Sequence, residues 1–177
     1  VGGSALDHLS ALQADAPDYR GLAEEWEAFR QASVLAIESS INSGDWAAAD
    51  MQLAGLAKAP AGALAAQPLA AELAARRLQA SYLATAAQAS TMTLQSGAQA
   101  VYPPELLARA VEGWVDLEFV VDRDGRTRDV VVKQASPPDR FDEAAVTAVQ
   151  QYRYVPFERD GRTYERRLKM RMRFQVQ

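Results

Sequence analysis

The sequence predicts an α+β protein, in which an all-helical N-terminal bundle precedes a small domain of strands and helices. The first hundred residues are rich in alanine and place apolar residues at helical spacing, whereas the last 75 alternate apolar and polar residues, as strands do. Residues 1–100 carry five basic and ten acidic side chains, and residues 101–177 carry fourteen and thirteen. This change of pattern and charge predicts a helical domain at 4–95, a linker at 96–100 and a second domain at 101–177.

Four helices are expected in the N-terminal part, because helix breakers and caps divide it. A short first helix ends near Pro17, and a longer second helix, capped by Asp18, stops at Gly44, which suits the left-handed position after a helix. The third helix is capped by Asp45 and stops before Pro60. The fourth is expected to begin near residue 68 and to continue toward residue 95.

The stretch around residues 35–60 contains Gly44, Trp46, Leu53 and Pro60 at a spacing that is similar to the second half of a tetratricopeptide-type repeat. Only one such unit occurs, and a plain helix hairpin gives the same pattern because it also needs a small residue and a stop. The favoured interpretation is a bundle that packs on itself or spaces the next domain. No partner for it follows from the sequence.

A β-hairpin is predicted between Gly113 and Ser136. Apolar residues alternate with polar ones from Val115 to Val121, and Asp124-Gly125 is a tight-turn dipeptide, because glycine adopts positive φ without steric cost. The second strand then carries its apolar residues on one face. Two strands joined by a tight turn follow from this pattern.

A helix and a further strand are expected after the hairpin. Asp139 or Asp142 can cap a helix that runs to about Tyr152. The last strand separates its residues into two faces with a period of two. One face is apolar, with Leu168, Met170, Met172, Phe174 and Val176, and the other is polar, with Arg167, Lys169, Arg171, Arg173 and Gln175.

The sequence offers no set of residues for catalysis or for binding a metal or cofactor. It has no cysteine, and His8 is its only histidine. The acidic residues between Asp116 and Asp124 lack the spacing of a calcium loop and fit outward strand and turn positions. No Gly-rich phosphate loop or Gly-x-Ser-x-Gly motif is present. We therefore expect no enzyme, no catalytic residue, no metal and no cofactor.

The cationic face of the last strand is the feature that bears most on function. Nucleic-acid binding is not expected, because the face has no aromatic residues for stacking and the domain has a net charge of only +1. Two interpretations remain. Outward cations can protect an edge strand from unwanted pairing. Alternatively, the edge accepts an extended segment of a partner as an added strand.

An ordered set of short motifs runs through the last 75 residues. It consists of Tyr102-Pro103, Gly113-Trp114-Val115, Asp122 with Asp124-Gly125, Val130 with Val132, Ser136-Pro137, Phe141-Asp142 with Ala145, Tyr152-Arg153-Tyr154 with Pro156, Asp160-Gly161 and the strand ending at Phe174. As a set, these residues resemble the C-terminal domain of TonB energy transducers. The resemblance covers less than half of the chain and implies a three-stranded antiparallel sheet with helices on one face.

The resemblance also implies a function. Domains of this family capture the extended box segment of a TonB-dependent outer-membrane receptor by strand addition and transmit force from inner-membrane motor proteins, without catalysing a reaction. Carried over by position, docking is expected at about 164–174, with 102–107 nearby. The expected partner-binding residues are Tyr102, Pro103, Leu107, Tyr164, Arg166, Arg167, Lys169, Arg171 and Arg173.

The implied location is the periplasm, with an inner-membrane anchor in an N-terminal segment that the 177 residues do not include. The chain departs from the family where Leu107 replaces a glutamine, where Glu105 replaces a basic residue, and where a helical domain replaces the Pro-rich spacer. These departures leave the receptor open. A non-transducing envelope scaffold or signalling adaptor that uses the same domain is the alternative function.

Overall fold

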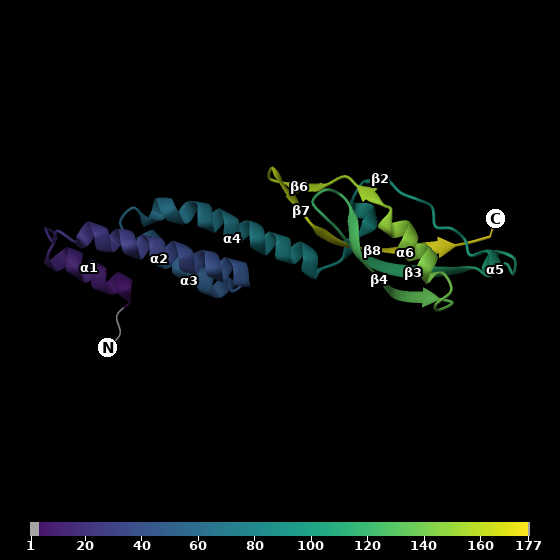
Figure 1. Ribbon diagram of the computed structural model, residues 1–177, viewed down its shortest axis with the longest axis horizontal. Helices are drawn as coiled ribbons and strands as arrows, with labels where there is room; N and C mark the ends of the chain where they lie inside the picture. The colour runs from purple at the N-terminus through teal and green to yellow at the C-terminus, as the bar shows by residue number, and fades with distance from the viewer. Residues whose placement is uncertain (1–3, 177) are drawn as a thin grey trace. The chain divides into compact units, whose positions relative to one another are not determined.

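The computed structural model describes residues 4–176 and confirms the α+β class, with four helices followed by a mixed-sheet domain (Figure 1). The chain divides into two compact units after Leu78. Within the described residues, no helix combines the length and apolar character needed to cross a bilayer. Whether 4–95, 96–100 and 101–177 are separate folding domains stays a prediction.

The helical unit contains α1 (Ala5–Asp15), α2 (Leu22–Ser43), α3 (Trp46–Lys58) and most of α4 (Gly62–Ala84). Local caps set several of these bounds. Asp45 accepts a hydrogen bond from the Ala48 backbone at the start of α3, and Gly44 ends α2 in the left-handed conformation. The sequence predicts Asp18 as the N-cap of α2, and this is wrong, because α2 begins at Leu22 and its N-cap is Gly21.

The fourth helix begins earlier than the sequence predicts, since α4 starts at Gly62 and contains Pro68. A proline inside a helix leaves the carbonyl four residues earlier without its donor. Here that carbonyl belongs to Leu64, which is among the most exposed apolar residues and can be hydrated. At the end of the helix, Ala84 is followed by non-helical structure, so the expected continuation toward residue 95 is wrong.

Two apolar clusters hold the helical unit together. Ile37 of α2 and Leu56 of α3 are fully buried at the centre of the larger cluster, which Leu69 and Leu73 of α4 complete. The smaller cluster contains Leu9, Leu22, Trp26 and Ala59. Burial of each leucine or isoleucine in these clusters stabilises the unit by about 1.5–3 kcal/mol.

The sheet of the second unit has four strands in the order β1-β8-β3-β4 (Figure 1). These are β1 (Ala87–Gln88), β3 (Gly113–Val121), β4 (Thr127–Ser136) and β8 (Arg166–Phe174). β3 is antiparallel to both β4 and β8, whereas β1 runs parallel to β8. The expected three-stranded antiparallel sheet is therefore extended by a short fourth strand, which makes it mixed.

Short elements surround this sheet. They are η1 (Ala89–Thr91), β2 (Leu94–Ser96), α5 (Pro104–Leu107), α6 (Asp142–Gln150), β5 (Arg153–Tyr154), β6 (Phe157–Arg159) and β7 (Arg162–Tyr164). β2 pairs with β5, and β6 forms a hairpin with β7. Residues 87–96 thus form two short strands and a 3-10 turn, of which β1 joins the four-stranded sheet and β2 forms a separate two-stranded sheet with β5.

One face of the sheet is covered by α6, and the core lies between them (Figure 1). Ala145, Ala148 and Val149 of the helix are buried against the apolar face of β3 and β8. Phe141, which precedes the helix, is completely buried and stacks on Phe174 with ring centroids 4.4 Å apart. The predicted helix is confirmed, but its N-cap is Phe141, not Asp139 or Asp142, and it ends at Gln150. The cationic face of β8 is the face that α6 leaves uncovered.

Candidate functional site

The outer edge of β8 is the candidate site. On its inner side β8 pairs with β3 along its whole length, from Arg166 opposite Val121 to Phe174 opposite Gly113. On its outer side β8 pairs only with β1, at Leu168 and Lys169. Residues 170–174 therefore have no strand partner on this side within the described part of the chain. An unpaired strand edge is the surface to which an extended peptide can add.

The N-terminal half of the same edge is occupied by the chain itself. The Gln79 side chain donates through Nε2 to the Glu165 carbonyl and accepts at Oε1 from the Glu165 N–H, both at 3.0 Å. The Gln79 side-chain amide therefore uses both main-chain hydrogen-bonding groups of Glu165, the residue just before β8, as a neighbouring strand would. β1 then covers Leu168 and Lys169. Only the C-terminal half of the edge, residues 170–174, has no strand partner within residues 4–176, and it is called the open edge below.

The two faces of β8 differ in chemistry, as the period of two predicts. Leu168, Met172 and Phe174 are buried in the core, and Met170 is partly buried. Arg167, Lys169, Arg171 and Arg173 are exposed on the opposite face. Val176 does not continue the apolar face, because β8 ends at Phe174 and the Val176 N–H donates to Glu112 Oε1 at 3.0 Å. A strand added at the edge would therefore meet apolar side chains on one face and cations on the other.

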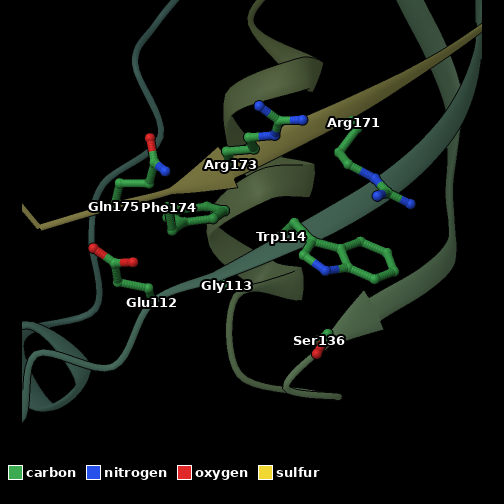
Figure 2. A pocket seen from close by; sticks show the side chains of 8 residues that line it. All are labelled: Glu112, Gly113, Trp114, Ser136, Arg171, Arg173, Phe174 and Gln175. Atoms are coloured by element: carbon green, nitrogen blue, oxygen red, sulfur yellow. The ribbon is translucent and has the colours of Figure 1, made fainter.

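Arg171 is the cation most firmly held within the domain. Its Nε and Nη2 donate to the two carboxylate oxygens of Asp116 on β3, both at 2.7 Å, and its guanidinium lies 3.8 Å from the centre of the Trp114 ring (Figure 2). The hydrogen bonds from Arg171 hold the pKa of the Asp116 carboxyl below its ordinary value, against an opposing effect of burial. Arg171 is thus already satisfied by its own sheet.

The other cations of this face remain available to a partner. Arg167, Lys169 and Arg173 form no ion pair with any of the residues 4–176. Arg173 lines a hollow of about 410 Å³ together with Trp114, Ser136 and Gln175, and Figure 2 shows its side chain turned away from the Trp114 ring. The uncovered face therefore carries free positive charge at positions next to the open edge.

The Asp116–Arg171 pair gives a testable prediction about pH. Replacing Arg171 with glutamine is expected to raise the pKa of Asp116 toward its ordinary value, because the charged donors are lost. Since the folded-state pKa is lowered, the pair stabilises the fold above an ordinary aspartate pKa of about 4. That contribution is lost as the pH falls through the lowered value. A titration of the Asp116 carboxyl carbon by NMR measures the shift, and an unchanged pKa in Arg171→Gln would contradict the assignment.

The residues expected near the edge at 102–107 have structural contacts. The Tyr102 hydroxyl donates to the Val111 carbonyl at 2.7 Å, and its ring packs edge-on against Phe174 and Phe141. Tyr102 therefore supports the end of β8 from the core side. Pro103 caps α5, and Leu107 at the end of this helix is exposed.

Tyr164 and Arg166 lie in an aromatic cluster at the other end of β8. Tyr164 is buried against Tyr82 of the last turn of α4, with ring centroids 5.6 Å apart. The Arg166 guanidinium lies 4.5 Å from the centre of the Phe157 ring. The structure therefore brings Lys169, Arg171 and Arg173 to the edge and places Tyr164 and Arg166 in packing contacts.

Neither β1 nor Gln79 could be found from the sequence, because neither has a periodic signal.

No three histidine, aspartate or glutamate side chains gather within the described residues in a way that could hold a metal ion. The geometry of the edge supports recognition through main-chain hydrogen bonds and charge.

Comparison with known proteins gives matches that cover about half of the chain. Residues 98–176 match the family described as Gram-negative bacterial TonB protein C-terminal. The solution NMR structure of the Pseudomonas aeruginosa TonB CTD is 28% identical, covers 49% of this chain and 88% of its own, and has a TM-score of 0.44. A structure of the TonB2 protein from Vibrio anguillarum is 33% identical, covers 51% of this chain and 83% of its own, and has a TM-score of 0.40. A search of curated proteins gave no match.

Proposed function

We propose, from the premise that residues 98–176 are a TonB C-terminal domain, that this protein transduces energy to outer-membrane receptors in a Gram-negative envelope. It binds the extended box segment of a receptor by strand addition at β8 and transmits force for active transport. The family acts without catalysing a reaction. The open edge at residues 170–174 is the observation that supports this proposal most strongly.

The chemistry of the edge fits an extended peptide. Five residues of strand present about 17 Å of main chain to a partner. Main-chain hydrogen bonds supply affinity without requiring a fixed sequence, and alternate side chains supply specificity. An added strand would place apolar side chains beside Met170 and Met172, and acidic ones beside Lys169 and Arg173.

The proposed location follows from the proposed function. The domain works in the periplasm, where the N-terminal ends of outer-membrane receptors are accessible. Under this proposal the protein is coupled to motor proteins of the inner membrane. Force then passes through the helical unit to the sheet and across the added strand to the receptor.

An NMR titration of the full 177-residue chain with a synthetic receptor-box peptide tests the proposal. The expected result is a set of amide shifts concentrated between Lys169 and Phe174, together with new slowly exchanging amides at residues 170–174. No shifts at millimolar peptide would contradict receptor binding and favour the envelope scaffold.

Two N-methylated versions of the peptide provide a matched control. In an added strand, only alternate residues direct their N–H and C=O groups toward the neighbouring strand. N-methylation at one set of alternate positions is therefore expected to abolish binding, while methylation at the other set leaves most of it. Equal loss for both peptides, or no loss for either, would contradict strand addition.

Arg173→Gln gives a smaller but specific effect. Because Arg173 has no ion pair within residues 4–176, its charge is available to an acidic partner. We expect about a two- to five-fold loss of affinity for an acidic box peptide at low salt, which is the scale of an exposed pair, and a smaller loss at high salt. Arg140→Gln, which removes a charge near α6, should leave affinity unchanged. Equal effects of the two variants would indicate that only net charge matters.

A further inference from the structure

The segment immediately after α4 lies on the edge that the proposed function requires. Ala87 and Gln88 pair in parallel with Leu168 and Lys169. Ala87, Ala89 and Met92 pack against the core cluster, whereas Gln88 is exposed on the cationic face. There Gln88 lines a hollow of about 430 Å³ together with Lys169 and Arg171. The chain therefore supplies its own alternating strand, apolar on one side and polar on the other.

This internal strand also stands in the path of a partner. In the parallel register of β1, the residues after Gln88 come next to the open part of the edge. Those residues form η1, Ala89–Thr91, which lies against β8 instead of continuing as a strand. A peptide that added at residues 170–174 would meet η1 before it had paired with the whole open edge.

The internal strand is weakly held compared with the rest of the sheet. β1 contributes two residue pairs, while β3 and β8 share nine. None of the side chains from Ala87 to Met92 is fully buried. The chain on both sides is fixed independently, by the Gln79–Glu165 hydrogen bonds before β1 and by the pairing of β2 with β5 after it. Release of residues 87–92 would therefore leave the remaining fold in place.

We propose that a partner strand replaces segment 87–92 along β8, and does not add beside it. This inference rests on the proposed function and states what the partner must look like. Its apolar side chains take the places of Ala87 and Ala89 on the core side, and an acidic side chain takes the place of Gln88 beside Lys169. The acidic residue gains a charge pair that the neutral Gln88 lacks, which favours exchange.

A reversible crosslink in the full chain tests whether segment 87–92 must leave β8 for the peptide to bind. The protein has no cysteine, so Gln88→Cys combined with Lys169→Cys introduces one possible disulfide between directly paired positions. With the disulfide formed, affinity for the receptor-box peptide is expected to fall at least ten-fold. Reduction of the same sample is expected to restore it. Each single cysteine variant, treated with the same oxidant, controls for effects of oxidation and of the substitutions.

The outcomes separate the inference from the function on which it rests. If the oxidised and the reduced double variant bound the peptide with equal affinity, replacement of segment 87–92 would be overturned, and strand addition at β8 would still stand. Failure of the peptide to bind the unmodified protein would overturn both.

Hydrogen exchange on the unmodified protein gives a second measurement that does not depend on a variant. Saturation with peptide is expected to accelerate exchange of the amides in residues 87–92 and to slow that of residues 168–174. If hydrogen exchange of the amides in residues 87–92 were unchanged or slower with the peptide bound, the proposal that the peptide replaces this segment would be overturned.

Discussion

Replacing Phe141 with alanine is expected to lower the free energy of unfolding of the C-terminal unit by about 3–5 kcal/mol, the range for a large buried aromatic side chain. Phe141 is completely buried and stacks on Phe174, with the Tyr102 ring packed edge-on against it. It also fills the space beside Gly113, where an added Cβ would come within 2.6 Å of the Phe141 ring. Its loss opens a cavity between α6 and the sheet.

The change should be measured on the domain itself, because two compact units need not unfold in one transition. Amide signals of β3 and β8, followed by NMR during a urea titration, report on the sheet alone. Val146→Ala, which removes a partly buried side chain from α6, is the matched control and should cost far less. A loss below about 1 kcal/mol for Phe141→Ala would contradict the central place of this ring in the core.

Gly125→Ala is expected to destabilise the domain by about 2 kcal/mol or more, since two costs combine. Gly125 has φ +80°, a left-handed conformation that costs an L-residue roughly 1–2 kcal/mol. In addition, a Cβ at this position would lie 2.0 Å from the Tyr154 carbonyl oxygen. The turn cannot move away easily, because the Gly125 carbonyl accepts a 2.8 Å hydrogen bond from the Tyr154 N–H.

Gly161→Ala separates the two costs. Gly161 also has a positive φ, of +72°, but an added Cβ would have no neighbour within 4 Å. This variant should therefore lose only the conformational part, roughly 1–2 kcal/mol. Urea unfolding of both variants, measured as for Phe141→Ala, gives the steric cost at Gly125 as the difference. Equal losses would mean that the contact with Tyr154 relaxes freely.

The elements that the sequence predicts well are those with local signals. The hairpin of β3 and β4 follows from alternation and from Asp124-Gly125, and both faces of β8 follow from its period of two. Helix α6 also appears close to its predicted place, at Asp142–Gln150. In each of these cases, neighbours in the sequence decide the structure, so tertiary context only has to agree with them.

The errors arise where distant residues decide the structure. β1 has two residues in an alanine-rich stretch, and its partner in β8 is about eighty residues away, so no periodicity can reveal it. Pro68 is tolerated inside α4 because Leu64, whose carbonyl it leaves without a donor, is an exposed residue, which the sequence does not show.

The candidate site follows the same division. The row of outward cations on β8 is predictable, but their individual roles depend on the register between β3 and β8. That register places Arg171 opposite Asp116 and leaves Arg173 beside Trp114 without an acidic neighbour across the strand. In the same way, Tyr164 and Arg166 belong to the cationic strand in sequence but pack with Tyr82 and Phe157 in space.

The position of β8 between β3 and an open edge has a mechanical consequence under the proposed function. A force along the strand axis loads the row of hydrogen bonds between two paired strands in shear. All of these hydrogen bonds then share the force, and they do not break one after another. On its inner edge β8 forms nine residue pairs with β3. On its outer edge a partner strand can pair with at most the seven residues 168–174. The pairing with the partner is thus the shorter of the two, and overload is expected to break it before β8 separates from β3.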